Sequence, residues 1–467
     1  MKSISGIRGR VGEGLTPPAV LRYVSGFVFL QKERHQTEAP TIVLGRDSRV
    51  SGSWLEQFVG SLLQSMGVTV ISLGVVPTPT VQLLVELEMA SLGGIVITSS
   101  HNPIEWNGLK FVDVDGHFLA PVLCAELYQM VDADPAWPPS SVFSNHLSQG
   151  AVRHLGDAQE RHVQALLDLP FIDPAQVAAL RLRVALDAVN GAGGHIIATL
   201  LAKLGCEVLG LNLEPTGVFA HPPEPVGSNL DQLCAHVRET GADLGIAVDP
   251  DVDRCVLVDH TGTPVGEEYT LALAVRFFLH HCGRRGPICK NLSSSRAVDE
   301  IAALFPGCPV HATPVGEIHV AKKMVEVGAI IGGEGNGGVM LPDVHIGRDA
   351  PVAVALTLMH LALEKCSLAE LKSRLPQYEI AKLKADLAPS ISPDDILESI
   401  RLEWVDRATI DVQDGLHIST PEWWVHLRKS NTEPIIRVIG EGGGLAASTA
   451  RCQEFLSIIQ SKLQHLV

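Results

Sequence analysis

The sequence predicts an α/β protein with three related α/β domains, each built on a mixed sheet, and a distinct α+β domain at the carboxyl end. Three observations lead to this prediction. Short strand-like runs alternate with amphipathic helical patterns, this rhythm occurs three times along the chain, and the last part of the chain follows a different pattern. Strands separated by helices are typical of crossover connections in largely parallel sheets.

The first domain is expected at residues 1–150. A strand-like run at 41–45 is followed by a helical pattern at 53–66 and by further strand-like runs at 68–74 and 93–98. The β-branched residues of these runs and the spacing of apolar residues between them distinguish strand from helix.

The alternation of strand-like and helical patterns occurs twice more along the chain. In a second domain at 151–260, a strand and a helix are expected within 184–205. In a third domain at 261–372, a helix is expected at 297–305 and a strand, loop and strand at 329–341.

The fourth domain is expected at 373–467. Its strand-like run at 424–442 is followed by a single helical pattern at 448–464. Strands followed by a helix, without alternation, indicate an α+β unit.

Composition excludes several classes of protein. The formal net charge of −16 argues against a nucleic-acid partner, because such proteins neutralise phosphates with a basic face. No apolar run reaches the ~20 residues of a membrane span, and the amino terminus lacks the apolar segment of a signal peptide. The nine cysteines are scattered, without a C-x-x-C pair. Reduced thiols and a cytoplasmic location are therefore expected, with no membrane partner.

Three polar loops follow expected strands: SSHNP at 99–103, DPDVDR at 249–254 and GEGNGG at 333–338. Ligands of open α/β sheets bind beyond the carboxyl ends of strands. The three loops are therefore expected to converge on one cleft.

The aspartate loop carries the sharpest signal. Asp249, Asp251 and Asp253 alternate between two apolar runs and predict a divalent cation site. A calcium hand is excluded, because its sixth and twelfth positions hold Arg254 and His260. Few carboxylates with an open position favour Mg²⁺ bound together with a substrate phosphate. The alternative is a solvated acidic turn.

The serine loop and the carboxyl-terminal loop have possible phosphate chemistry. In SSHNP a serine hydroxyl is a candidate phosphoryl carrier, and the alternative is an Asn-Pro turn capped by serines. Hydroxyl, amide and guanidinium donors near the carboxyl end favour a binding site for the substrate phosphate that does not react. The alternative is a basic strand at the protein surface. These donors are Arg428, Ser430, Asn431, Thr432 and Arg437.

The glycine-rich loop offers groups for a sugar. Glu334 is expected to accept hydrogen bonds from sugar hydroxyls, and Asn336 to donate and accept them. A simple glycine-rich hairpin turn is the alternative.

These loops, in this order, resemble those of the α-D-phosphohexomutase family from end to end. Further segments similar to the family's motifs are Ser5–Gly9, Gly45–Gly52, Val76–Pro79 and Asn107–Lys110. The resemblance implies four domains around a central active-site cleft, with three domains alike and the last different.

The resemblance also implies a mechanism. Ser100 would carry the phosphoryl group, with Asp249, Asp251, Asp253 and the phosphoserine around one Mg²⁺ ion. The enzyme would interconvert hexose 6-phosphate and hexose 1-phosphate through a 1,6-bisphosphate, which would also act as activator. Four other positions are implied in the site: Arg8, Lys110 and His101 as catalytic residues, and Arg254 as a substrate-binding residue.

Two positions depart from the family's common pattern. Gly338 stands where many members have His, so the acid–base role of that His is not available in this chain. His345 either replaces it or is a structural residue. Asn336 stands where mannose and glucose mutases more often have Ser. The GEGNGG form is similar to that of members acting on amino sugars and of archaeal-type relatives of mixed specificity. Glucosamine 6-phosphate and glucosamine 1-phosphate are therefore the expected substrates.

Three other functions remain open. The first is a phosphoglucomutase or phosphomannomutase of the same family. The second is an aspartyl-phosphate phosphatase in which Asp249 is the nucleophile and Asp251 the acid, and the third is a sugar-phosphate sensor without turnover. The expected partner is a small hexose phosphate, and the chain is expected to be a monomer or a homodimer.

Overall fold

A computed structural model describes residues 2–466 apart from 145–148, 389–390 and 431–433. The chain divides into two compact units. Unit 1 holds Met1–Gly283 and Asn336–Lys372, and unit 2 holds Arg284–Gly335 and Ser373–Val467.

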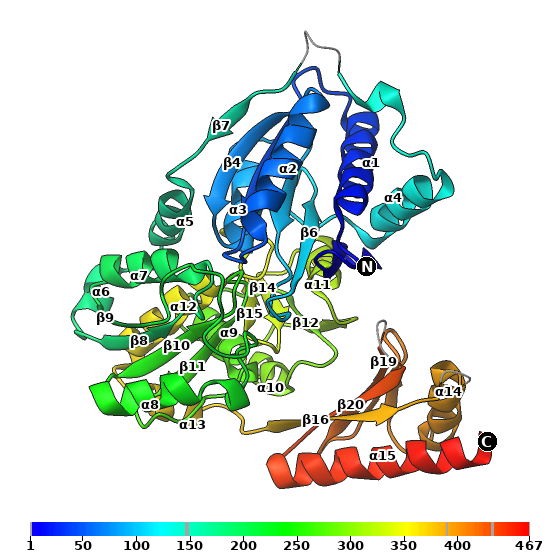
Figure 1. The fold of residues 1–467 in the computed structure, drawn as a ribbon. Coiled ribbons are helices and arrows are strands. Elements are labelled where there is room, and N and C mark those ends of the chain that lie inside the picture. The colour runs from blue at the N-terminus through cyan, green and yellow to red at the C-terminus, as the bar shows by residue number, and fades with distance from the viewer. Residues whose placement is uncertain (1, 145–148, 389–390, 431–433, 467) are drawn as a thin grey trace. The chain divides into compact units, whose positions relative to one another are not determined.

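Unit 1 begins with a seven-stranded sheet in the order β1-β2-β6-β5-β3-β4-β7 (Figure 1). Its strands are β1 (Lys2–Ser3), β2 (Gly6–Arg10), β3 (Thr41–Arg46), β4 (Thr69–Val75), β5 (Gly94–Ile97), β6 (Trp106–Val112) and β7 (Val152–His154). The strands β5, β3, β4 and β7 are parallel, whereas β6 runs antiparallel to both β5 and β2. The sheet is therefore mixed, as predicted.

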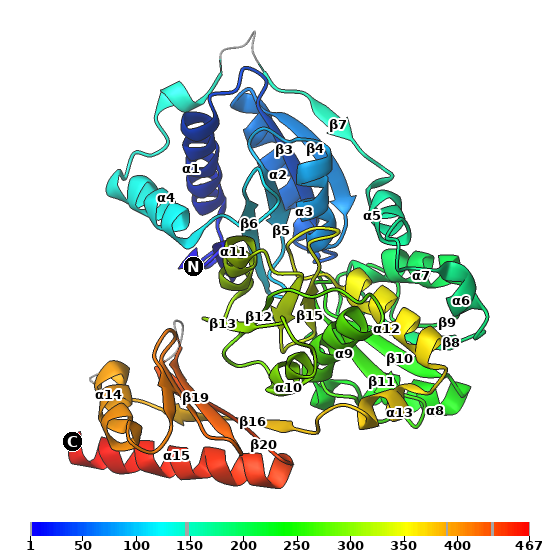
Figure 2. The same ribbon diagram turned by 180° about the vertical axis from the view of Figure 1, so that it is seen from behind.

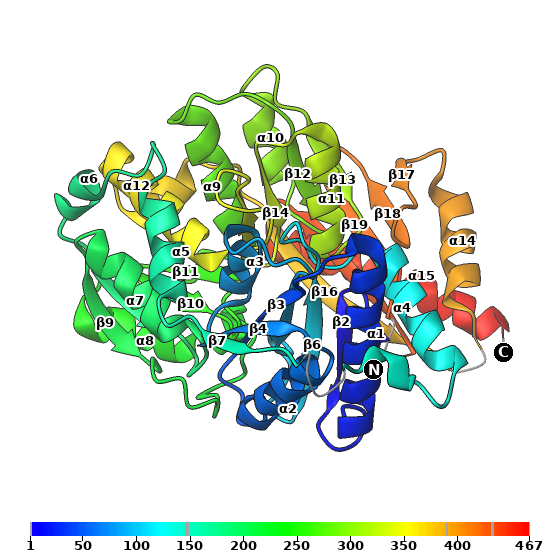
Figure 3. The ribbon, with the colours of Figure 1, turned by 90° about the horizontal axis from the view of Figure 1, so that it is seen from above.

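Helices cover both faces of this sheet. They are α1 (Pro17–His35), α2 (Gly52–Ser65), α3 (Thr78–Leu87) and α4 (Pro121–Ala133), and η1 (Ser140–Val142) is a short 3₁₀ turn. Ile42 and Leu44 face the core formed with α1, α2 and α4. A side chain at Gly45, on the other face, would meet Val81 of α3. Figure 3 shows α2 and α3 on opposite sides of β3 and β4.

A second sheet in unit 1 has the order β11-β10-β8-β9. Its strands are β8 (Arg183–Asp187), β9 (Glu207–Leu211), β10 (Leu244–Val248) and β11 (Cys255–Asp259), and only β11 is antiparallel to its neighbour. The associated helices are α5 (Ala158–Leu167), α6 (Pro174–Ala178), α7 (Gly193–Lys203) and α8 (Asp231–Thr240), with η2 (Gly227–Asn229) before α8.

Unit 1 is completed by α9 (Glu268–His280), β15 (Gly338–Met340) and α12 (Ala350–Glu364). The helices α9 and α12 pack against each other and against β15. Nearly every residue of α12 is buried, which explains why its sequence is apolar on all sides.

Unit 2 contains a parallel arrangement of β12 (Ile288–Asn291), β13 (Val310–Thr313) and β14 (Ile331–Glu334), with β12 in the middle. Its helices are α10 (Ala297–Ala303) and α11 (Glu317–Val327). The short helix α13 (Leu368–Ser373) lies at the end of the unit 1 segment Asn336–Lys372, where the chain passes into unit 2.

The carboxyl-terminal part of unit 2 is an antiparallel sheet in the order β16-β20-β19-β18-β17 (Figure 2). The strands are β16 (Glu379–Asp386), β17 (Thr409–Asp411), β18 (Leu416–Ser419), β19 (Trp424–Lys429) and β20 (Ile435–Gly442). The helices α14 (Pro393–Trp404) and α15 (Leu445–Leu466) share one apolar core with this sheet. The predicted α+β domain is confirmed.

None of the helices that the structure describes is both long enough and apolar enough to cross a membrane. The nine cysteines all lie within the described residues, and none forms a disulfide.

Candidate active site

The serine loop follows β5 directly. Ser100 adopts a φ of 49°, a left-handed conformation that costs energy for a residue with a side chain. The hydroxyl of Thr98 accepts a hydrogen bond from the Ser100 backbone N–H at 2.9 Å and helps to hold this conformation. Ser100 is buried, with 6% of its surface exposed, and its Oγ donates to Asp249 Oδ2 at 3.1 Å.

Arg49 fixes the serine loop through hydrogen bonds to its backbone. Its guanidinium donates to four backbone carbonyls, those of Ser100 and Asn102 at 2.6 Å, Pro103 at 2.7 Å and Trp106 at 2.9 Å. Arg49 is fully buried, and its Nε donates to Asp47 Oδ2 at 3.0 Å. Arg49 belongs to the family-like segment 45–52, for which the sequence alone indicates no role. A positioning role is visible only when the four carbonyls are in place.

The aspartate loop follows β10. Asp249, Asp251 and Asp253 are each fully buried, and one oxygen atom from each lies within 4.8 Å of the others. Val252 has a φ of 62°, so the turn is tight enough to bring all three carboxylates to the same side. The alternative of a solvated acidic turn does not fit this burial.

Two oxygens of the cluster are suited to a cation. Oδ1 of Asp251 and Oδ1 of Asp253 are buried, and neither accepts a hydrogen bond from any residue that the structure describes. Buried polar atoms without a partner are rare and need an explanation. Burial, with the charges of Asp253 and Asp251, raises the pKa of Asp249 well above its ordinary value. A divalent cation would supply the missing charge, and an all-oxygen donor set fits a hard ion such as Mg²⁺.

Lys110 and Thr78 fix the orientation of the aspartates. Lys110 Nζ, on β6, donates to Asp251 Oδ2 at 2.7 Å and to Asp253 Oδ2 at 3.3 Å. The Thr78 hydroxyl donates to Asp251 Oδ2 at 2.7 Å. Burial alone would raise the pKa of Asp251, but the charge of Lys110 and these two hydrogen bonds lower it below its ordinary value. Asp251 is therefore a carboxylate at neutral pH.

Arg8 lies on the strand that pairs with β6. The register places Arg8 of β2 opposite Gly108, two residues before Lys110. Its Nη1 donates to Asn102 Oδ1, in the serine loop, at 3.3 Å. The structure thus brings Arg8, Lys110 and the serine loop together.

His101 and Arg254 extend the cluster around Glu224. His101 Nδ1 lies 3.2 Å from Ser100 Oγ, and Arg254 Nη1 donates to Glu224 Oε1 at 3.2 Å. Burial, followed by the positive charge of Arg254, lowers the pKa of His101 well below its ordinary value. His101 is therefore neutral near pH 7 and able to accept a proton at Nδ1.

Arg348 is a site residue that the sequence analysis missed. Its Nη2 donates to Asp253 Oδ2 at 2.6 Å. Arg348 passes close to Gly338, because a Cβ built at Gly338 would lie 2.3 Å from Arg348 Cδ. The glycine that departs from the family's common pattern therefore leaves room for an arginine to reach the aspartate loop.

We expect Gly338→Ala to lower catalytic activity by about tenfold, because the added methyl group would push Arg348 away from Asp253. Steady-state rates at saturating substrate would check this. Gly156→Ala is the matched control, since a Cβ at Gly156 meets nothing within 4 Å. Equal activity in the two variants would show that Arg348 is dispensable.

His345 is the possible replacement for the missing His. Its Nε2 lies 2.9 Å from Asp349 Oδ2, an atom that is also 2.7 Å from His162 Nε2. Asp349 Oδ1 accepts from the Val352 N–H and caps the start of α12. All three side chains are buried. These contacts favour the structural alternative for His345.

The sugar-loop residues fall in different units. In unit 2, Glu334 is buried at the end of β14, and its Oε1 accepts from Asn291 Nδ2 at 2.7 Å and from the Gly316 N–H at 2.8 Å. In unit 1, Asn336 Oδ1 accepts from the Gly338 N–H at 3.3 Å.

The predicted phosphate seat lies in unit 2. Arg428 of β19 forms an ion pair with Asp414 at 2.7 Å, and Arg437 lies opposite it on β20 with its side chain exposed. The Ser430 N–H donates to the Ile435 carbonyl at 3.1 Å. Asn431 and Thr432 lie outside the described residues.

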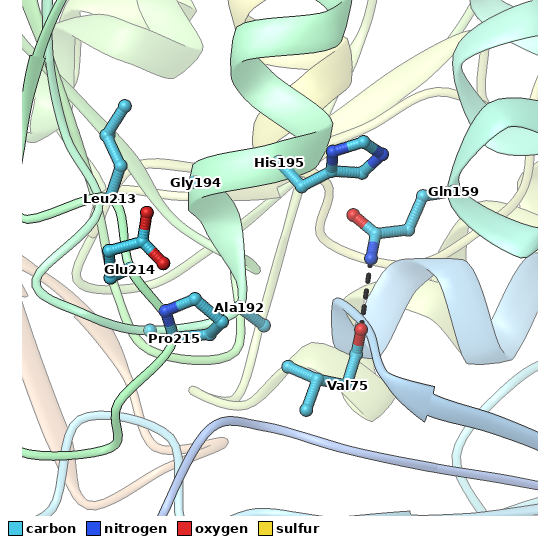
Figure 4. Close-up of a pocket in the computed structure, with 9 residues that line it drawn as sticks. Val75, Gln159, Ala192, Gly194, His195, Leu213, Glu214 and Pro215 are labelled. Atoms are coloured by element: carbon cyan, nitrogen blue, oxygen red, sulfur yellow. Dashed lines mark hydrogen bonds between the residues drawn. The ribbon is translucent and has the colours of Figure 1, made fainter.

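A pocket of about 340 Å³ lies elsewhere in unit 1, at the start of α7 (Figure 4). Gln159 Nε2 donates to the Val75 carbonyl at its wall at 3.0 Å, and the side chains of Glu214 and His195 border it. None of the predicted site residues lines this pocket.

A buried serine hydroxyl beside a carboxylate cluster that suits a divalent cation is the arrangement of an enzyme that transfers phosphoryl groups. Comparisons with known proteins support this class. Models of the phosphoglucomutase/phosphomannomutase α/β/α domains I, II and III match residues 2–136, 160–262 and 266–378.

Two curated relatives span nearly the whole chain. A probable phosphoglucosamine mutase of Methanopyrus kandleri is 35% identical over 466 residues, covering 98% of this chain and 97% of the relative. A phosphoglucomutase/phosphomannomutase of Thermococcus kodakarensis is 33% identical over 461 residues, covering 97% and 96%. Among solved structures, a phosphoglucomutase/phosphomannomutase family protein of Burkholderia thailandensis has a TM-score of 0.82 at 25% identity, covering 98% of this chain and 96% of its own.

The chain therefore belongs to the α-D-phosphohexomutase family, and the resemblance seen in its loops is confirmed.

Proposed function

We propose that the chain interconverts glucosamine 6-phosphate and glucosamine 1-phosphate through a phosphorylated Ser100. The observation that carries this proposal is the contact of 3.1 Å between Ser100 Oγ and Asp249 Oδ2 inside the buried aspartate cluster. The name of the Methanopyrus kandleri relative supports the choice of glucosamine.

Phosphoryl transfer runs in two steps. In the first, the free hydroxyl of the sugar phosphate attacks phosphorus and gives up its proton, while the bond between phosphorus and Ser100 Oγ breaks and Ser100 Oγ takes up a proton. This gives a 1,6-bisphosphate. In the second step, Ser100 Oγ gives up that proton and attacks the other phosphate, while the bond between phosphorus and the sugar oxygen breaks and the sugar oxygen takes up a proton. His101 Nδ1, 3.2 Å from Ser100 Oγ, is proposed to relay the proton in both steps.

Mg²⁺ held by Asp249, Asp251, Asp253 and the serine phosphate would supply positive charge to the transferring phosphoryl group. Arg8 and Lys110 add fixed positive charge on the side of β2 and β6. Such charge, already in place before the reaction, stabilises the transition state without further reorganisation.

Other residues are proposed to bind substrate. Glu334 and Asn336 would bind sugar hydroxyls or the amine, and Arg254 would bind a phosphate. The non-reacting phosphate would be bound by Arg428, Ser430, Asn431, Thr432 and Arg437. A hexose 1,6-bisphosphate is the proposed activator, because it would phosphorylate Ser100 in enzyme that has lost its phosphate. We further propose that the protein is cytoplasmic, a monomer or a homodimer, and divided into domains at residues 150, 260 and 372.

The test is a mutase assay with Mg²⁺ and a trace of hexose 1,6-bisphosphate. Values of kcat/KM would be compared for glucosamine, glucose and mannose phosphates. A clear advantage for glucosamine phosphate would support the proposal. A preference for glucose or mannose phosphate would retain the mutase mechanism but reject glucosamine. No mutase turnover with any of the three would reject the mutase and favour a sugar-phosphate sensor or the phosphatase.

We expect Arg428→Ala to raise KM by about tenfold or more with little change in kcat, because phosphate binding away from the reaction is lost equally in ground and transition states. Arg401→Ala is the control, since the Arg401 guanidinium donates to Glu398 on the same helix, α14. A fall in kcat at constant KM would instead place Arg428 at the reacting phosphate.

A further inference from the structure

A second group of metal-binding side chains lies in unit 1, at the carboxyl ends of α9 and α12. His280 and His281 end the first helix and are followed by Cys282. His360 and Glu364 lie four residues apart on the second. Residues at this spacing share one face of a helix, so both can point at the same neighbour.

The two helices pack against each other and bring these groups together. His281 Nε2 lies 3.1 Å from Glu364 Oε1, and the rings of His280 and His281 have centroids 4.7 Å apart. One donor atom from each of His280, His281 and Glu364 lies within 4.8 Å of the other two. Two nitrogens and one carboxylate oxygen therefore converge.

His360 provides an independent observation. It is completely buried, its ring interacts with the Leu273 backbone, and no described residue forms a well-aligned hydrogen bond with either ring nitrogen. Its ring centroid lies 5.3 Å from that of His281. A buried imidazole without a well-aligned hydrogen bond is the kind of donor that a metal ion uses.

We propose that His280, His281 and Glu364 bind a Zn²⁺ ion, with His360 as the nearest further imidazole. Two imidazoles and a carboxylate, leaving a fourth position, match the donors that zinc takes. Mg²⁺ prefers oxygen donors alone, which are those of the aspartate cluster. The partly exposed position of the three ligands leaves the ion a path from solvent. This site is separate from the proposed chemistry, so its test does not depend on the substrate.

The test uses Zn²⁺ alone as the probe, added by isothermal titration to the full-length protein in excess Mg²⁺, which is added to compete for the aspartate cluster. We expect one Zn²⁺ per chain, and an affinity at least about tenfold weaker in Glu364→Gln and in His281→Ala. The matched control is the double substitution of His195 and Glu160 by Ala and Gln, because that exposed pair also has a contact of 3.0 Å but belongs to no such cluster.

Cobalt gives a second measurement. Co²⁺ bound at four positions with imidazole ligands absorbs visible light much more strongly than Co²⁺ in an all-oxygen octahedral site. We expect this band in the wild-type protein and in the His195 control, and its loss in Glu364→Gln, whose circular dichroism should match that of the wild type. Unchanged zinc affinity and an unchanged cobalt band in both ligand variants would overturn the proposal. Mutase activity is expected to be the same in Glu364→Gln and the wild type.

Discussion

Ser100→Ala is expected to abolish mutase turnover, with a loss of at least about a thousandfold, while the protein stays folded. The hydroxyl that would carry the phosphoryl group is missing in this variant, and no neighbouring group can replace a covalent carrier. The fold should survive because Ser100 is held through its backbone, by Thr98 and by Arg49, and not through its side chain alone. The measurement is turnover with saturating sugar phosphate, Mg²⁺ and bisphosphate, alongside the melting temperature.

Ser99→Ala is the control for this experiment. Ser99 precedes Ser100 in the same buried loop, and its Oγ donates to Asn102 Oδ1 at 3.4 Å. We expect most of the activity to remain. Loss of activity in Ser99→Ala with activity retained in Ser100→Ala would move the phosphoryl carrier by one residue.

The chemistry of the intermediate separates the mutase from the aspartyl-phosphate phosphatase. Protein labelled with phosphate from the substrate should keep its label in hydroxylamine, because a phosphoserine is not an acyl phosphate. Release of the label by hydroxylamine, together with its persistence in Ser100→Ala, would assign the nucleophile to Asp249.

Strand ends were the most predictable part of this molecule. The run at 41–45 became β3, the helical pattern at 53–66 became α2, and the serine and aspartate loops follow β5 and β10 as expected. Alternation and apolar spacing are local properties, so the sequence displays them directly. Polar residues at the end of an apolar run are equally visible.

Residues that act through long-range contacts were not predictable. Arg49 is an ordinary arginine in the sequence, and its role depends on four carbonyls that lie more than fifty residues away. Arg348 likewise reaches Asp253 across 95 residues of chain. The sequence carried one indirect signal for Arg348, the absence of a side chain at Gly338, but its meaning depends on the distance between them.

The antiparallel pairing of β16 could not be predicted from the pattern of residues either. The strand β16 was not identified, although it pairs along its full length with β20. Its residues alternate in burial, but they include several charged side chains on the exposed face. An edge strand of this kind has a weak apolar signal, and its partner lies some fifty residues away along the chain.

Asp251→Asn is expected to raise the Mg²⁺ concentration for half-maximal activity at least about tenfold and to lower turnover about a hundredfold or more. Asp251 is a carboxylate in the folded protein because Lys110 and Thr78 stabilise its charge. The amide is nearly the same size and can still accept from one of these donors, but it contributes no negative charge to a cation. Activity titrations with Mg²⁺ at saturating substrate would measure both effects.

Asp259→Asn is the control. It makes the same chemical change at the end of β11 that is farther along the chain from the aspartate loop, where Asp259 accepts hydrogen bonds from the backbone of Thr261 and Thr263 in a turn. It should leave the Mg²⁺ dependence unaltered. If Asp251→Asn also kept the wild-type Mg²⁺ dependence, the aspartate loop would not be the cation site. Oδ1 of Asp251 and Oδ1 of Asp253, which accept no hydrogen bond from any described residue, would then need another positive partner, and Arg254, whose Nε lies 3.7 Å from Asp253 Oδ1, has the charge to provide it.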